Sequence, residues 1–585
     1  GWVFQIIMLV LGIGFPLVLV FAWAFEMTPE GLKKEKDVDR SQSIASRTGQ
    51  KLNFTIAALL MLSLAYIAYD KLTMNEMRSE PLSQESVVQM TASGDEKEAP
   101  TLNAPPQMAD TQRSIVVLPF VNMSNDPDQE FFSDGLSEEL LNVLAQIKDL
   151  RVISRTSAFA FKGKDVDIPT IAAQLHVTHV LEGSVRKAGD DIRITAQLIE
   201  VATDSHLWSD AYNRKMENVF EIQEEISKAI AQQLQVTLGT AGQNGKPTHN
   251  LEAYQLFLRG RHFYQNRGQE QLAQAIKLLK QAVDLDPDFA EAWANLAAAN
   301  VVYGYSREDD FDNYYKDGQR AAMRAIAIDP DNGFAHAVLG LIHMGDLAWE
   351  DAMREYDLAI RLNPNETNSL LWKGIELLSL GYTEQALVIF HQAEKLDPVF
   401  TNLQYWLFMA YTVKGDVESM LSTYQKIQQL YPGYNDVNSS DYELFSGNLE
   451  VAEQIARTSE IESTGSDVLA AAVFSVLRDP KLKKQAVETL TSYKLTFGDE
   501  TVNPLWRIGA TEEVLVAFRN MQERGNGLRA ANPLYLIWVA YDRAQLSSPL
   551  MPAFFESTGM ADYWRKHGNP DYCRVEGASI ECETQ

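Results

Sequence analysis

The chain has 585 residues, of which 46% are hydrophobic and 10% aromatic, enough for two or three domains with cores of their own. Its net charge is −28, from 51 basic and 79 acidic residues. This negative charge argues against nucleic acid and anionic lipid as partners of the soluble part, because both would be repelled.

Two apolar runs near the start of the chain predict transmembrane helices. Trp2 to Phe25 contains no charge and is long enough to span a bilayer core, and Leu52 to Tyr69 is near the lower limit of length. Buried core helices of a soluble domain are the alternative, but apolar runs of that kind are usually shorter. We therefore expect a two-helix anchor over residues 1–70.

The basic residues around these runs predict the orientation of the anchor. Residues 26–51 carry six lysines and arginines, whereas the forty residues after Tyr69 carry only Lys71, Arg78 and Lys97. Cytoplasmic loops are enriched in lysine and arginine, so 26–51 is expected in the cytoplasm and the rest of the chain in the periplasm. The chain begins at Gly1 without an initiator methionine, which predicts a missing upstream segment.

Residues 71–112 are polar and contain several prolines, so they predict a disordered periplasmic linker. Residues 113–240 then show a different pattern. Buried strands near Ser114 and at "LRVIS" alternate with helices at 131–147 and 168–175, and three strand-like runs precede a closing helix at 221–238. This pattern indicates a compact α/β domain.

Polar residues at one edge of this domain form a candidate cleft. One group follows the end of a strand and another precedes a helix, positions where α/β sheets often bind ligands. The alternative is ordinary loop and helix-cap chemistry. The candidate cleft residues are Asp134, Ser154, Arg155, Thr156 and Ser157.

The stretch "SIVVLPFVNMSNDPDQEFFSDGLSEELLNVLAQIKDLRVISRTSAFAFKGKDVDIPTIAAQLHVTHVLEGSVRK" resembles the TolB-like amino-terminal domain, which precedes tetratricopeptide repeats in many Gram-negative membrane proteins. The resemblance extends to "GFPLVLVFAWAFEMTPEGLKKEKDVDRSQS" and to "YWRKHGNPDYCRVEGASIEC". It implies an inner-membrane protein. Relatives are often labelled adenylate or guanylate cyclase because some carry a cyclase domain, and others carry a winged-helix DNA-binding domain. Neither domain is present in this sequence, so neither activity is carried over.

Regularly spaced prolines independently predict tetratricopeptide repeats over residues 250–545. Intervals of 34 residues, the period of this repeat, separate the last four of Pro287, Pro330, Pro364, Pro398 and Pro432. Within two successive periods the same pattern of small and aromatic residues recurs, which lets two helices pack closely. The matching positions are Gly340, Ala352, Tyr356 and Ala359, and then Gly374, Ala386, Phe390 and Ala393.

The first helix of each repeat lines the concave face of such an array. The repeat register places there a set of apolar residues, here called the groove residues: Phe334, Leu341, Met344, Leu371, Ile375, Leu378, Tyr405 and Met409. No basic residue falls at these positions, which argues against capture of a terminal carboxylate and favours an apolar segment of a partner protein. The alternative is that the groove packs against later helices of the same chain.

The C-terminal stretch, residues 546–585, holds both cysteines of the chain, Cys573 and Cys582. Their proximity predicts one disulfide in an oxidising compartment, and two unpaired thiols are the alternative. His176, His179 and His206 are the nearest approach to a metal site, and no carboxylate or cysteine completes the set. Phosphate-binding loops and nucleophile elbows are absent from the sequence, so we expect no metal, cofactor or catalytic residue.

Together these patterns predict a multidomain protein with a transmembrane helical anchor, an α/β domain of the TolB-like kind and an all-α tetratricopeptide superhelix. The expected function is a non-enzymatic scaffold at the inner membrane, with most of the chain in the periplasm. Its expected partners are envelope proteins and, through the anchor, the lipid bilayer, but not nucleic acid. A signalling protein that senses a periplasmic ligand for a missing cytoplasmic effector is the alternative, and an enzyme would need catalytic groups that the sequence does not offer.

Overall fold

The computed structural model describes residues 25–28, 31–34, 113–124, 126, 129–147, 149–236, 248, 250–266, 268–305, 311–431, 437–464, 466–492, 499–523, 532–539 and 543–583. The chain divides into two compact units, residues 1–107 and 108–585.

In the first unit, β1 (Phe25–Thr28) pairs antiparallel with β2 (Gly31–Lys34). Phe25, predicted to end a transmembrane helix, therefore lies in a strand, because it is paired with Lys34. Residues 2–24 and 52–69 of the predicted spans lie outside the described residues, as does the predicted linker 71–112.

The described helices give no support to the predicted anchor. None of them is both long enough and apolar enough to cross a membrane. In the second unit the helices bury their apolar faces against one another, as amphipathic helices of a globular fold do. The predicted fold class is therefore wrong in its transmembrane anchor: the described chain is mostly helical, with TPR-like helical repeats, and no helix within it is a transmembrane anchor.

The second unit opens with a six-stranded sheet. Its strand order is β5 (Leu150–Val152), β3 (Arg113–Val117), β6 (His179–Ala188), β7 (Asp191–Glu200) and β8 (Ser205–Lys215), and β4 (Val121–Asn122) pairs with β6 beyond β3. Strand β3 runs parallel to both β5 and β6, whereas β7 and β8 continue the sheet antiparallel.

Helices cover both faces of this sheet. On one face, α3 (Glu130–Ala145) and α6 (Val219–Gln233) contribute apolar side chains such as Leu140 and Ile226 to the main core. On the other face, α4 (Arg155–Phe159) and α5 (Ile168–Leu175) pack over a smaller core. Strands β3 and β5 are therefore buried on both sides, whereas β8 is mostly exposed.

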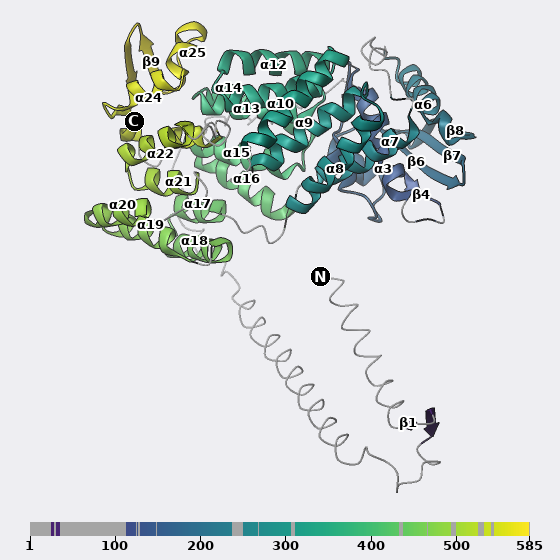
Figure 1. The fold of residues 1–585 in the computed structure, drawn as a ribbon, viewed down its shortest axis with the longest axis horizontal. Coiled ribbons are helices and arrows are strands. Elements are labelled where there is room, and N and C mark those ends of the chain that lie inside the picture. Colours follow the sequence, from purple (N-terminus) through teal and green to yellow (C-terminus); the bar gives the residue numbers. More distant parts are fainter. Residues whose placement is uncertain are drawn as a thin grey trace, which may run out of the picture. The chain divides into compact units, whose positions relative to one another are not determined.

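Helical hairpins follow and stack on one another (Figure 1). Their helices are α7 (Leu251–Gln265), α8 (Gln269–Leu285), α9 (Ala290–Tyr305), α10 (Phe311–Ile328), α11 (Gly333–Gly345), α12 (Trp349–Leu362), α13 (Thr367–Ser379), α14 (Thr383–Leu396), α15 (Thr401–Lys414), α16 (Val417–Leu430), α17 (Val437–Phe445), α18 (Leu449–Thr464), α19 (Val468–Arg478), α20 (Lys483–Ser492), α21 (Asp499–Arg507) and α22 (Thr511–Glu523), with the short η5 (Pro480–Leu482) before α20.

The small-to-aromatic pairs predicted from the repeat pattern hold the two helices of a hairpin together. A Cβ atom on Gly340 would lie 2.7 Å from the Tyr356 ring, and one on Gly374 would lie 2.3 Å from the Phe390 ring. Only glycine allows such a close approach. The predicted tetratricopeptide repeats are confirmed at this level.

After α22 the chain forms a C-terminal segment, which we call the tail (residues 532–583). It comprises the 3₁₀-helices η6 (Asn532–Trp538) and η7 (Arg543–Ser547), the helices α24 (Met551–Ser557) and α25 (Met560–His567), and a hairpin of β9 (Cys573–Glu576) and β10 (Ser579–Cys582). Much of the tail is apolar and buried, including Trp538, Phe555 and Trp564. It therefore belongs to the core of the second unit.

Candidate functional site

Most of the predicted groove is covered. Two of the eight groove residues, Phe334 and Tyr405, are half-buried. The other six are buried: Leu341, Met344, Leu371, Ile375, Leu378 and Met409. Repeat helices account for part of this burial, and the tail accounts for another part.

The tail segment η6 packs against α13 and α15. Its Tyr535 ring meets the Trp406 ring edge-on, with centroids 4.9 Å apart, and its hydroxyl lies 3.2 Å from the Tyr405 hydroxyl. Trp538 is fully buried and donates its Nε1 hydrogen to the Ser379 carbonyl over 2.8 Å. The α13–α15 face, defined here by Ser379, Tyr405 and Trp406, is therefore occupied by the chain itself.

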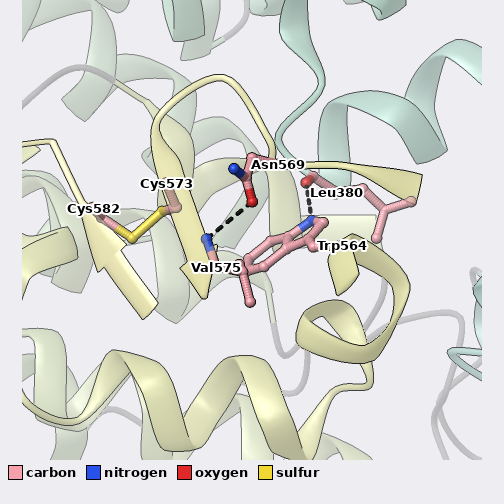
Figure 2. The surroundings of a disulfide bond; sticks show 6 residues. All are labelled: Leu380, Trp564, Asn569, Cys573, Val575 and Cys582. Carbon is pink, nitrogen blue, oxygen red and sulfur yellow. Dashed lines mark hydrogen bonds between the residues drawn. A yellow bond between two sulfur atoms is a disulfide. The ribbon is translucent and has the colours of Figure 1, made fainter. Parts of the chain in front are cut away.

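Other tail groups satisfy the C-terminal end of α13. The last carbonyls of a helix have no partner within the helix. Here the Trp564 Nε1 donates to the Leu380 carbonyl over 2.9 Å (Figure 2), and the Asp571 amide donates to the Gly381 carbonyl over 3.0 Å. Gly381 has a φ of +84°, and a Cβ atom there would lie 2.9 Å from the Trp538 ring. This turn therefore needs a glycine to receive the tail.

The tail ends in a small cross-linked hairpin. Cys573 and Cys582 are paired opposite each other on β9 and β10 and are joined by a disulfide (Figure 2). The Asn569 side chain accepts a hydrogen bond from the Val575 amide over 2.9 Å, which links the hairpin to the turn before it. The hairpin thus closes on itself close to the segment that caps α13.

The predicted cleft of the α/β domain is filled by a loop of the repeat array. Ser157 donates a hydrogen bond from its hydroxyl to an Asp397 carboxylate oxygen over 2.6 Å, and it accepts one from the Val399 amide over 3.2 Å. The Ser154 amide donates to the Leu396 carbonyl over 2.8 Å. The α14–α15 loop therefore occupies the position where a ligand was expected.

A second loop covers the same sheet edge. The Asn365 side chain, between α12 and α13, donates to the carbonyls of Ala145 and Leu150 over 2.8 and 3.1 Å. Its oxygen accepts from the Val152 amide over 3.2 Å. Asn365 therefore satisfies backbone groups of the edge strand β5 and fixes the α/β domain to the array.

Burial controls the charge of Asp397. Burial raises the pKa of its carboxyl to about 6, although the hydroxyls of the Ser154–Ser157 run favour the charged form. The carboxyl of Asp397, at an internal junction, therefore changes its charge at moderately acidic pH.

The Thr156 side chain also hydrogen-bonds to Asp397, and the two charged cleft residues form ion pairs within the fold. Asp134 accepts from Lys162 at 2.5 and 2.6 Å, and burial nevertheless raises its pKa. Arg155 pairs with Glu138, which Arg261 of α7 also contacts at 2.9 Å. Burial opposes the charge of Glu138, but the two guanidinium groups outweigh it and lower the pKa. Arg155 thus takes part in a cluster of charges that links α3, α4 and α7, and Asp134 links α3 to the turn after α4.

A buried carboxyl in α13 has no hydrogen-bond partner among the residues that the structure describes. Both oxygens of Glu376 are unpaired, as is the hydroxyl of Tyr356 in α12. Burial raises the pKa of Glu376 well above its usual value. Burial raises the pKa of Tyr563 in α25, and the charge of Glu376 is the next largest cause of this rise. Glu376 therefore lies close to the tail.

The histidines named above have local structural surroundings. The His176 residue ends α5 in a left-handed conformation with φ of 53°, and the His179 Nδ1 lies 2.9 Å from the Thr178 hydroxyl. Within the described ranges, no group of three or more histidine, cysteine, aspartate or glutamate residues is placed to hold a metal ion.

Four residues that make these internal junctions, Asn365, Asp397, Tyr535 and Trp538, were not found by sequence reasoning. Asn365 and Asp397 lie in repeat loops next to Pro364 and Pro398, where polar residues are common. Trp538 and Tyr535 lie in a segment with no repeat register. Nothing in the sequence around Trp538 and Tyr535 indicates which part of the array they contact.

Two family models match parts of the chain. A TPR repeat model matches residues 267–301, and a model described as HilA/YgeH-like transcriptional regulator, second domain, matches residues 111–233. The second match covers the six-stranded sheet and its helices. The TolB-like assignment is not confirmed, because the likeness to TolB from Acinetobacter baumannii has a TM-score of 0.18 at 18% identity over 21% of this chain and 29% of that chain.

Two curated proteins are similar to parts of the chain. Putative adenylate cyclase 3 of Rhizobium meliloti (strain 1021) is 39% identical over 206 residues, 34% of this chain and 35% of the relative. Transcriptional regulator HilA of Salmonella typhimurium (strain LT2) is 22% identical over 298 residues, 50% of this chain and 53% of the relative. The chain thus spans about a third and about half of their lengths. Among solved structures, a thermophilic TPR protein from Thermus thermophilus matches with a TM-score of 0.29 at 18% identity, over 33% of this chain and 98% of that chain.

Proposed function

We propose that this chain is a protein-binding scaffold in which the repeat array receives a segment of a partner protein. The observation that carries the proposal is the array itself, stacked helical hairpins in which the groove residues Phe334 and Tyr405 are half-buried and the other six are buried. Arrays of this kind serve as extended binding surfaces. The α/β domain is fixed to the array through Asn365 and Asp397 and acts with it as one platform.

Site-specific photo-cross-linking in cells tests the scaffold role. A benzoylphenylalanine at Phe334, a half-buried groove residue whose ring lies 6.3 Å from that of Trp372, keeps an aromatic side chain at this position. The matched control is the same group at Val388, which is 58% exposed on α14. We expect a discrete cross-linked protein from position 334 and none from position 388. No cross-link at 334, or equal cross-linking at both, contradicts the role.

We further propose that the array works in the periplasm and binds envelope proteins. The disulfide between Cys573 and Cys582 supports this location, because such bonds persist in oxidising compartments. Cells are lysed in acid with a thiol-blocking reagent, and the fraction of chains with the disulfide is measured by mass spectrometry. We expect nearly complete oxidation in the cell. Two blocked thiols in most chains contradict a periplasmic location.

A second candidate function is a regulatory input for an effector carried elsewhere. The similarity of residues 111–233 to a domain of transcriptional regulators favours it, as does the similarity to a putative adenylate cyclase. The same type of module would then serve several effectors by binding proteins. The reading frame upstream of Gly1 discriminates: an effector domain there supports regulation, and its absence leaves the scaffold role as the better explanation.

A further inference from the structure

The segment η6 lies on the repeats as a bound ligand does. After α22 the chain doubles back, so that Tyr535 meets Tyr405, 130 residues earlier, and Trp538 meets Ser379, 159 residues earlier. A further repeat would instead stack on the last hairpin of the array. Although η6 also contacts α21, its aromatic residues bind the middle of the array.

The chemistry of η6 is that of a recognition segment. Its sequence "NPLYLIW" has no charge, and Leu534 to Trp538 are all buried. Residues three apart lie on the same side of a 3₁₀-helix, which places Tyr535 and Trp538 together. Both direct polar groups as well as rings at α13 and α15, so they combine apolar burial with hydrogen bonding.

The contacts of η6 do not depend on its covalent connection. An indole donating to a helix carbonyl, a ring meeting a ring edge-on and a pair of hydroxyls are available to any peptide with the same side chains. Aromatic anchors of this type dominate the energy of protein interfaces.

We propose that η6 is an intramolecular ligand of the α13–α15 face, and that a partner binds there by presenting an uncharged segment with a tyrosine and a tryptophan three residues apart. The proposal rests on the scaffold role and adds the chemistry of the partner and a built-in competitor. A tethered ligand competes at an effective concentration on the order of millimolar. The partner's apparent association constant is therefore its intrinsic value multiplied by the fraction of chains in which η6 is released.

A peptide of residues 532–539, NPLYLIWV, with a fluorescent label is the direct probe. It is titrated into the full chain and into the variant Tyr535→Ala/Trp538→Ala, which keeps the α13–α15 face but weakens its resident ligand. We expect the variant to bind the peptide at least about tenfold more tightly than the wild type. A peptide with both aromatic residues replaced by alanine should bind neither protein.

The matched control variant is Trp293→Ala. Trp293 also donates its indole hydrogen to a backbone carbonyl, that of Pro287, over 3.0 Å, but it lies in α9 of an earlier repeat. This variant should bind the peptide as weakly as the wild type does.

Hydrogen exchange of the wild-type chain gives a second test that needs no variant. Excess unlabelled peptide should accelerate exchange at residues 534–539, because displaced η6 loses its protection, while α13 stays protected. This measurement decides the question if the double variant does not fold.

Clear results overturn the proposal. If the folded double variant does not bind the peptide, or if peptide leaves the exchange of residues 534–539 unchanged, η6 is a fixed part of the core. Dimerisation of the double variant without peptide uptake also overturns it, because the face would then belong to a second copy. Cross-linking at Phe334 is independent of these results, so a partner found there together with failed peptide binding rejects the role of η6 alone.

Discussion

Two internal junctions of the second unit bury the surfaces that the sequence offered as binding sites, and they do so with different chemistry. The α/β junction (Ser154, Ser157, Asn365 and Asp397) is made of hydrogen bonds to backbone and carboxylate groups. The tail junction (Ser379, Tyr405, Tyr535 and Trp538) is made mainly of aromatic rings.

This difference in chemistry indicates which junction can separate. Opening the α/β junction strands buried polar groups of a sheet edge, which is costly. Opening the tail junction exposes apolar surface that a partner of similar chemistry can cover again. We therefore expect the first junction to be permanent and the second to be exchangeable.

The largest expected effect comes from breaking the α/β junction. Asn365→Ala leaves two carbonyls and one amide of the β5 region without a partner, so we expect the free energy of unfolding to fall by about 4 kcal/mol. Chemical denaturation measures it. Asn368→Ala is the matched control, because the Asn368 side chain donates its hydrogen bond within the same loop, to the Glu366 carboxylate over 2.8 Å. Equal losses from both variants contradict the assignment of Asn365.

The next effect is a pH dependence at the same junction. The pKa of Asp397 is raised to about 6 in the folded chain from 3.8, so the folded chain holds a proton that the unfolded chain has released. The stabilisation is complete below pH 3.8 and is lost as pH rises through about 6. Between those limits the wild type should lose about 3 kcal/mol relative to Asp397→Asn. Parallel pH profiles of the two proteins argue against this effect.

A smaller effect on the free energy of unfolding is expected from Glu376, which lies close to the tail. Glu376 has a raised pKa and no hydrogen-bond partner, so wild-type stability falls as pH rises above 4.5. Glu376→Met should raise the free energy of unfolding by about 2 kcal/mol at pH 8, because it removes a buried unpaired group. At pH 4 the gain should shrink. A loss of stability at pH 8 would show that the carboxyl has a partner in solution.

The smallest expected effect comes from a substitution in the tail junction. Trp538→Phe keeps most of the ring burial but removes the donor to the Ser379 carbonyl, at a cost of about 1 kcal/mol. We expect faster hydrogen exchange at residues 534–539 and an unchanged global unfolding midpoint. A shift of the global midpoint instead would mean that the tail unfolds together with the array.

Local patterns predicted the elements well. The structure places α5 at Ile168–Leu175, the residues expected, because Asp167 caps its first turn and Pro169 favours its start. The repeat hairpins also follow from sequence, since a glycine facing an aromatic ring recurs at a fixed period.

The sites were less predictable because they depend on contacts between distant parts of the chain. The repeat register selected Tyr405 but not the segment that contacts it, which lies more than a hundred residues later. Ser154 and Ser157 were predicted to line a cleft at one sheet edge, and their hydrogen-bond partners are ordinary residues of the repeat array. Phe25 was expected to end an apolar helix, and backbone pairing with Lys34 places it in a strand.

The most direct test compares native-state hydrogen exchange at the two junctions of the wild-type chain. If the tail junction is exchangeable, amides of residues 534–539 open locally and exchange at least about a hundredfold faster than amides of β5, which need global unfolding. If both sets exchange at the same rate and respond equally to denaturant, the tail is an inseparable part of the core and the distinction between the junctions is wrong.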